Sequence, residues 1–359
     1  MSDTRPTTTE KFRRIVNGTS IRTARQFEAL FILGLVAFVV ALPTIAETLM
    51  GFRGVASNIL IWMLFAVAFN ILLGYAGLLS FGHAMFLGGS MYIVAITMRE
   101  LGAAMVVLGF PLALLAAGAV AYAIGRLIVN KGEIYFALLT IAFGEIIWFI
   151  GNSDPGGLTG GNDGLSSGML PPFVEAFRGQ LRVVFGSIEF PIYWAVGVLF
   201  VVGVYLLFRI ARSPFGRTIR VISENEQLAR SIGINTYRYK IHTFVISAVF
   251  TALAGGTLVL VNQSVATSQL TWHTSGEVVI MAILGGISSF VGPMVGVFLW
   301  FFAEYSLTGM ESLGELRHHW RFGLGLLFVV VVLSAPEKGA YGVIKDAGMW
   351  VMNKLTGEN

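Results

Sequence analysis

The chain has 359 residues, of which 55% are hydrophobic and only 12% are Asp, Glu, Lys or Arg. Soluble globular domains carry about 25% charged residues, so the composition excludes a soluble enzyme, a nucleic-acid-binding module and a disordered chain, and predicts a polytopic helical membrane protein. The chain has no cysteine, which excludes disulfides, thiolate nucleophiles and cysteine-type zinc sites.

The predicted elements follow a polar N-terminal extension, 1–26, which is basic and has no small-residue cleavage site. It is therefore not expected to be a cleaved signal peptide, and the first span is expected to serve as an uncleaved anchor. Stretches of about 20 apolar residues can cross a bilayer as helices. The predicted spans are 27–46, 55–73, 78–98, 103–129, 134–151, 190–208, 240–261, 277–303 and 322–335. The transmembrane domain therefore covers 27–336 and is followed by a short C-terminal tail, 337–359.

The apolar stretch 277–303 decides the number of crossings. It contains the helix breakers Gly285-Gly286 and Gly292-Pro293, so it is either one crossing or two short helices hinged near Gly292-Pro293. The first reading gives nine spans and the second gives ten, which we prefer. The fold class is therefore an all-α membrane protein with about ten transmembrane helices, some of them short or interrupted.

Positive charge sets the orientation. The segment 209–240 holds seven Lys and Arg residues, so the positive-inside rule places it in the cytoplasm, together with the N-terminus. By alternation, the Gly/Pro-rich loop 152–189 and the segment 262–276 face outward.

The cytoplasmic loop 209–239 contains a predicted helix, 224–232. Ser223 and Glu226 have the spacing of a capping box, and Gly233 stands where a left-handed C-terminal cap is expected. Leu228 and Ile232 give the helix one apolar stripe. The alternative is a solvated connector whose arginines only set the topology.

Several sequence blocks resemble a known family. Gln227-Leu228-Ala229-x-x-x-Gly233 resembles the Glu-Ala-Ala-x-x-x-Gly signature of ABC importer permeases, with Gln-Leu in place of Glu-Ala. The stretch 213–235 is similar to the corresponding loop of the branched-chain amino-acid permease family, particularly its LivM-type members. The blocks that agree in order and spacing are 70–86, 135–145, 158–165 and 283–296, and the resemblance covers roughly residues 54–336.

The resemblance implies a half-pore that pairs with a paralogous permease, or with a second copy of itself. Two ATP-binding subunits would bind below it, and an extracytoplasmic binding protein would deliver substrate. It assigns ATPase coupling to Arg217, Arg220, Ser223, Glu224, Glu226, Leu228, Ala229, Ile232 and Gly233. The dipeptide Gly-Lys of a Walker A loop does not occur, so we expect no cofactor on this chain, with ATP and Mg²⁺ on the partner ATPases.

The residues predicted to line the translocation pathway are Asn70, Gly74, Gly77, Ser80, Gly82, His83, Phe86 and Glu145. The small residues suit an interrupted helix at membrane depth or, alternatively, tight helix packing. His83 is either a packing histidine or a substrate contact, and Asn70 is an interhelical hydrogen-bonding residue or a pore residue. Glu145 is a functional candidate because a carboxylate in hydrocarbon is costly unless it is paired or faces a cavity.

The outer loop holds a second group of candidates, Thr159, Gly160, Gly161 and Asn162, where the resemblance implies an ordered turn at the outer mouth instead of a flexible linker. Asp154, Asn162 and Asp163 lack the spacing of a calcium loop, so no metal site is expected.

Together these features predict a permease subunit of an ATP-driven importer in a prokaryotic inner membrane. The expected cargo is a branched-chain or other small hydrophobic amino acid. The alternatives are a urea or short-chain amide ABC permease, and an ion-coupled secondary transporter. No nucleic-acid partner is expected.

Overall fold

The structure, a computed structural model, describes residues 8–166, 191–309, 320–334 and 338–356, which are almost entirely helical. The longer helices are α1 (Thr8–Met50), α2 (Val55–Ala76), α3 (Ala84–Leu101), α4 (Val106–Ile128), α5 (Glu133–Asn152), α7 (Pro191–Arg212), α8 (Pro214–Glu224), α9 (Glu226–Ser231), α10 (Thr236–Asn262), α11 (Trp272–Gly285), α12 (Gly292–Gly309), α13 (Trp320–Ser334) and α14 (Gly339–Thr356). Short 3₁₀ turns are η1 (Ala103–Met105), η2 (Pro155–Gly157), η3 (Gly161–Asp163) and η4 (Thr267–Leu270), and the strands are β1 (Leu165–Ser166) and β2 (Ser264–Val265), which pair antiparallel.

The expected all-α membrane architecture is confirmed. Within the described residues, six helices are long and apolar enough to cross a bilayer, or seven if the bent pair α13–α14 is one span. They are Glu28–Met50, Val55–Ala76, Val106–Ile128, Glu133–Asn152, Ile192–Arg212 and Thr236–Asn262. The 14 residues of α11 would extend only about 21 Å, less than the roughly 30 Å of a hydrocarbon core. The count of ten spans stays a prediction.

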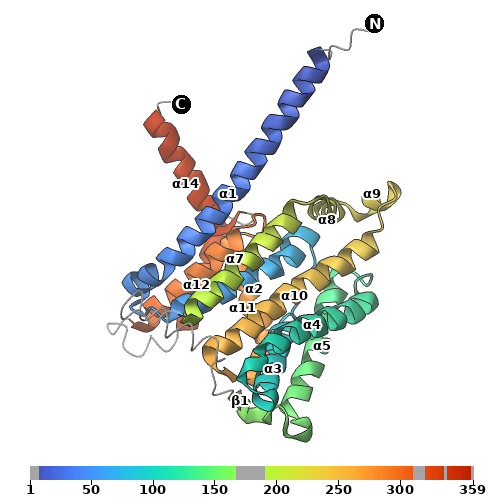
Figure 1. Ribbon diagram of the computed structural model, residues 1–359, viewed down its shortest axis with the longest axis vertical. Coiled ribbons are helices and arrows are strands. Elements are labelled where there is room, and N and C mark those ends of the chain that lie inside the picture. The colour runs from blue at the N-terminus through green and yellow to red at the C-terminus, as the bar shows by residue number, and fades with distance from the viewer. Residues whose placement is uncertain (1–7, 167–190, 310–319, 335–337, 357–359) are drawn as a thin grey trace.

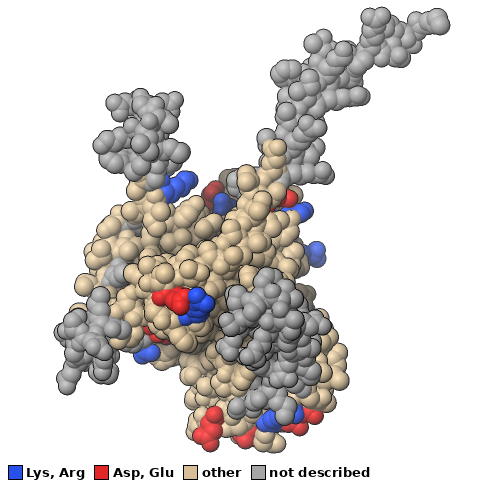
Figure 2. Space-filling view, turned by 60° about the vertical axis from the view of Figure 1, so that its left-hand side comes forward, with Lys and Arg blue, Asp and Glu red and all other residues tan. Residues whose placement is uncertain are grey.

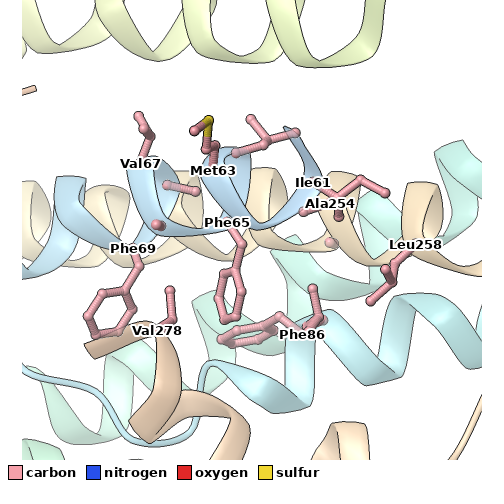
Figure 3. Close-up of a cluster of buried hydrophobic side chains, with 14 of the residues drawn as sticks. Ile61, Met63, Phe65, Val67, Phe69, Phe86, Ala254, Leu258 and Val278 are labelled. Carbon is pink, nitrogen blue, oxygen red and sulfur yellow. The ribbon is translucent and has the colours of Figure 1, made fainter. Parts of the chain in front are cut away.

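Helix α2 is the centre of the bundle. In its most apolar stretch of 18 residues, 83% of the residues are buried, against 22% in α1 and 28% in α4. Helix α2 packs on α10, α7, α12 and α11. Phe65 and Phe69 of α2 point toward Phe86 of α3 and Val278 of α11 (Figure 3). A helix that is apolar on every side must be surrounded by protein or lipid, and here protein surrounds α2 while the peripheral helices expose apolar side chains.

The peripheral helices expose large apolar side chains. Leu115 of α4 and Ile134 of α5 are 72% and 76% exposed. Figure 2 shows one face on which charged side chains are few and stand in small groups between broad uncharged areas. Such a surface is favourable in hydrocarbon and unfavourable in water.

The predicted span 78–98 begins too early. Gly77 ends α2 in the left-handed conformation (φ +70°), with hydrogen bonds from its N–H to Leu73 O and from Leu78 N–H to Leu72 O, 3.1 Å each. These bonds satisfy the last carbonyls of α2. The chain then continues without helix until Ala84, where α3 starts.

The interruption predicted in 277–303 is present, and it lies directly before Gly292-Pro293, between the two predicted pairs of helix breakers. Helix α11 ends at Gly285, and Gly286 follows with a φ of +107°. Gly292 and Pro293 are the first residues of α12, because proline fits the first turn of a helix, where its missing N–H costs no hydrogen bond. The break is therefore the segment 286–291.

The two ends of the described chain are more helical than expected. Residues 8–26 of the predicted extension form the N-terminal part of α1, and the predicted C-terminal tail contains α14. Figure 1 shows the first half of α1 and most of α14 extending away from the bundle, while the start of α14 packs against α11 and α12.

Candidate functional site

The candidate coupling segment consists of α8 and α9, which lie at one end of the bundle (Figure 1). Ser213 caps α8, its Oγ accepting a hydrogen bond from Gly216 N–H at 3.3 Å, and Pro214 occupies the first turn. Ile219 and Ile222 are buried, so α8 packs on the bundle instead of projecting into solvent.

Helix α8 rests on the end of α2. The guanidinium of Arg220 lies 4.1 Å from the ring centroid of Tyr75, a cation–π contact. A methyl group on Gly77 would lie 2.8 Å from Ser223 Oγ. The sequence did not identify Tyr75 as a residue of the coupling segment, because a tyrosine near the end of an apolar span also suits an interfacial anchor. Arg217 is exposed.

The predicted cap of α9 is wrong. Ser223 and Glu224 lie in the last turn of α8, and the helix begins after Asn225, whose Oδ1 accepts from Leu228 N–H at 2.9 Å. Asn225 is extended (φ −156°, ψ 96°), which is the conformation of a cap residue and separates the two helices. Asn is among the strongest cap formers and directly precedes the acidic Glu226, so the signal was present in the sequence.

Glu226 connects α9 to α10 and does not complete a capping box. Its carboxylate accepts from Lys240 Nζ at 2.7 Å, Arg230 Nη2 at 2.7 Å and Thr236 Oγ1 at 2.9 Å. Partial burial favours the neutral acid, but the hydrogen bonds from Lys240, Thr236 and Arg230 outweigh it and hold the pKa of Glu226 below its usual range. Lys240 and Thr236 follow so far along the chain that no local pattern predicts this cluster.

Leu228 of α9 and Ile232, which directly follows α9, form an exposed apolar pair. Leu228 and Ile232 are 57% and 66% exposed, while Ala229 is fully buried against the bundle. Gly233 ends α9 with a φ of +86°, as its predicted cap role requires, and Ile234 N–H bonds to Ala229 O at 3.1 Å. The apolar stripe thus faces away from the chain that carries it.

His83 lies in the core. It is fully buried, with Nδ1 2.8 Å from Ser80 Oγ and Nε2 2.8 Å from Ser247 Oγ. Because Ser247 Oγ donates to Ala68 O at 2.7 Å, it must accept from Nε2–H, so we assign the neutral Nε2–H tautomer. Phe69, Phe86 and Phe244 meet the imidazole edge to face. This environment matches the packing alternative for His83.

The glycines of the same block allow backbones to meet. A side chain on Gly74 would collide with Ile287 O in the 286–291 break, and one on Gly82 would collide with Thr140 O of α5. Asn70 Nδ2 donates to Ser289 O at 3.1 Å, so α2 also holds that break by a hydrogen bond.

The first turn of α3 is held by other helices. Ala84 N–H donates to Ser275 Oγ of α11 at 2.8 Å, and Phe81 N–H donates to Thr140 Oγ1 at 3.2 Å. The small-residue block therefore brings α2, α5, α11 and the 286–291 break together around the non-helical segment before α3. Its role in the pathway stays a prediction.

Glu145 stands apart from this cluster. It lies on α5, a peripheral helix in whose most apolar stretch only 28% of the residues are buried. The Glu145 side chain is half-buried. Among the residues described, Glu145 has no hydrogen bond or ion pair. A carboxylate in that position needs either water or another chain beside α5.

The outer loop is ordered around Asp154. Its Oδ1 accepts from Thr159 N–H at 2.8 Å, Thr159 Oγ1 at 3.1 Å and Gly160 N–H at 2.9 Å. The backbone hydrogen bond from Thr159 holds the pKa of Asp154 below its usual value, with partial desolvation opposing it and Gly160 and the Thr159 hydroxyl adding to it. Gly160 and Gly161 have positive φ, and Asn162 is exposed. The rest of the predicted loop, 167–189, lies outside the described residues.

In the described part of the chain, no group of three or more His, Asp or Glu side chains could hold a metal ion.

Residues 51–333 match the family described as branched-chain amino acid transport system / permease component. The chain belongs to this family. It is thus a permease component of a transport system, and its apolar helices make it a multi-pass membrane protein.

Several curated proteins are similar to the chain over most of its length. The high-affinity branched-chain amino acid transport system permease protein LivM of Salmonella typhimurium is 26% identical over 332 residues, covering 86% of this chain and 74% of that protein. LivM of Escherichia coli is 26% identical over 337 residues, with the same coverage. LivH of Escherichia coli is 29% identical over 300 residues, covering 77% of this chain and 92% of LivH. No solved structure gives a significant match.

Proposed function

We propose that the chain is the membrane-spanning permease subunit of an ATP-driven importer for branched-chain or other small hydrophobic amino acids. It forms one half of the translocation pathway beside a paralogous permease. Two ATP-binding subunits dock on its cytoplasmic side, and an extracytoplasmic binding protein delivers the substrate. The family match over residues 51–333 carries this proposal, and the names of the LivM and LivH relatives support the substrate class and the pairing.

The coupling segment supports a role for α9 as the contact with the ATPases. Leu228 and Ile232 form an exposed apolar pair on a short helix outside the bundle. The Glu226 cluster fixes α9 to the start of α10, and Arg220 of α8 stacks on Tyr75 at the end of α2. A displacement of α9 is therefore passed to α10 directly and to α2 through α8.

In the proposed orientation, the N-terminus and the coupling segment are cytoplasmic, and the Asp154 loop is on the outer side of the inner membrane. ATP and Mg²⁺ bind to the partner subunits. The permease contributes the conduit and the mechanical connection to it.

The proposal is tested with the complete transporter in proteoliposomes. We expect Leu228→Asp and Gly233→Pro to abolish binding-protein-dependent leucine uptake and its coupled ATP hydrolysis, because the first places a charge in the docking face and the second destroys the left-handed cap of α9. Insertion of the permease, followed by its recovery from membranes, should not change.

The matched control is Gln26→Glu, which adds the same charge to an exposed position of α1 and should leave uptake intact. Unchanged coupled uptake in both α9 variants contradicts the docking role. Leucine uptake by the permease alone under an ion gradient, without ATPases, would instead establish a secondary transporter.

A further inference from the structure

A cavity of about 860 Å³ lies at the end of the bundle opposite the coupling segment. It lies between the first turns of α2, the end of α10, the turn η4, the first turns of α11, and α12 and α13. Because α2 starts at this cavity and ends beside α8, the proposed orientation places the cavity on the outer side. We call it the outer cavity.

One side of the outer cavity is aromatic. The lining includes Trp62, Trp272, Trp300 and Phe301, and the rings of Trp62 and Phe301 meet edge to face at 6.5 Å. Such a surface accepts an aliphatic side chain, and the faces of tryptophan rings also attract an ammonium group.

Polar groups line the rest of the outer cavity. Asn58 and Gln269 contribute side-chain amides, and Asn58 Oδ1 is buried without a hydrogen-bond partner in the described part of the chain. A buried amide oxygen without a donor carries a desolvation cost. A ligand N–H that donates a hydrogen bond to Asn58 Oδ1 would remove this desolvation cost.

Charges of both signs meet at the same place. Glu277 and Arg321 line the cavity with His273, and the half-buried Glu304 of α12 is within electrostatic range of both Glu277 and Arg321. Among the described residues, these two carboxylates and the Arg321 guanidinium lie within electrostatic range of one another. A ligand that brings an ammonium group to Glu277 and an anionic group to Arg321 leaves the net charge unchanged and places an opposite charge beside each of these two side chains.

We propose that the outer cavity binds a zwitterionic aliphatic α-amino acid. Glu277, supported by Glu304 and Asn58, takes the ammonium group, Arg321 takes the carboxylate, and the aromatic side takes the side chain. The inference rests on the proposed function and adds to it a receiving site within one permease chain. An ethanolamine lipid headgroup has the same pair of charges, so the experiment separates the two sources.

Binding of radiolabelled leucine is measured on the assembled transporter without binding protein, in nanodiscs of phosphatidylcholine, which has no primary ammonium group. We expect saturable binding that weakens about tenfold in Glu277→Gln and in Arg321→Gln, a change of about 1.4 kcal/mol. Arg321→Lys should retain part of the affinity. Leucinol and 4-methylpentanoate, each lacking one charge, should compete less well than leucine.

The control variants are Glu47→Gln and Arg53→Gln, which remove an exposed ion pair between the end of α1 and the start of α2 and should bind leucine normally. Absence of saturable binding to the unmodified transporter, or equal binding by the cavity variants and the controls, overturns the proposal.

A second measurement leaves the charges intact. The chain has no cysteine, so Ser268→Cys in the cavity lining and Ser264→Cys, at an exposed position of the adjoining strand β2, each provide a single thiol in this chain. Leucine should slow maleimide labelling of the first variant at least severalfold and leave the second unchanged. Equal rates with and without leucine, or protection of Ser268→Cys by phosphatidylethanolamine and not by leucine, would overturn the proposal.

Leucine uptake in proteoliposomes separates this inference from the function. Uptake without binding in the outer cavity contradicts the inference alone. Absence of uptake for every aliphatic amino acid tested contradicts the proposed function.

Discussion

Glycine at position 82 sets the distance between α5 and the segment that precedes α3. Any side chain there would meet the backbone carbonyl of Thr140, which belongs to a helix and cannot rotate away. Gly89 stands seven residues later, in α3, and a methyl group added to it would meet nothing within 4 Å. Position 82 therefore has no room for a side chain, whereas position 89 has room for one.

We expect Gly82→Ala to destabilise the protein by about 1–3 kcal/mol, the usual effect of overpacking a filled core. Gly89→Ala should be neutral, or stabilising by up to about 1 kcal/mol, because alanine favours a helix over glycine. The measurement is the thermal midpoint of the purified protein in detergent, followed by tryptophan fluorescence. Equal midpoints for the two variants would contradict the close contact at Gly82.

The sequence predicts that the small residues of 74–86 mark either a helix interrupted at membrane depth or close packing. The close packing is present, and an interruption at membrane depth stays a prediction. Gly77 ends α2, while Gly74 and Gly82 allow close approach. Their contacts, Ile287 and Thr140, are far along the chain. Such pairs depend on how the whole bundle packs, so a local pattern cannot identify them.

At the scale of elements, the segment between α8 and α9 shows two helix caps in competition. Ser223 and Asn225 both suit a cap, and Ser223 has the more familiar spacing to Glu226. Glu226 is held by Lys240, Arg230 and Thr236, so it is not available to reach back to a capping serine. Asn225 takes the role because its cap needs no help from the glutamate.

Asn225→Ala should therefore loosen α9, with a loss of about 1 kcal/mol and roughly fivefold faster amide hydrogen exchange over residues 226–231. Ser223→Ala should leave exchange in α9 unchanged, because the Ser223 side chain caps nothing. Mass-spectrometric hydrogen exchange on the purified protein distinguishes the two variants. Faster exchange in the Ser223→Ala variant alone would support Ser223 as the helix cap, as predicted from the sequence.

Most span boundaries could be predicted because apolar length and charge define them. The starts of α3 and α12 could not, because a glycine in an apolar stretch can end one helix, begin another or simply pack. Gly77 does the first, Gly292 the second and Gly82 the third.

At the scale of the whole molecule, the arrangement has a definite polarity. The coupling segment lies at the end where α2 stops, and the Asp154 loop lies at the other. The distribution of positive charge predicts that the first end faces the cytoplasm. The outer cavity, by contrast, is built from six elements spread along the chain, so no stretch of sequence could predict it.

Because the chain lacks cysteine, a single introduced thiol reports the orientation. A membrane-impermeant maleimide should label Ser153→Cys in intact spheroplasts and Ser231→Cys only in inverted vesicles. Both positions are exposed in the structure. Labelling of Ser231→Cys in intact spheroplasts would reverse the assigned orientation.

The exposed pair Leu228 and Ile232 has a consequence for biogenesis. A copy of the subunit that is made in excess of its partners presents these two side chains to the aqueous phase, where chaperones and proteases recognise apolar surface. The same contact that would transmit movement in a finished transporter would thus mark unassembled copies for removal, which would keep the subunits in balanced amounts.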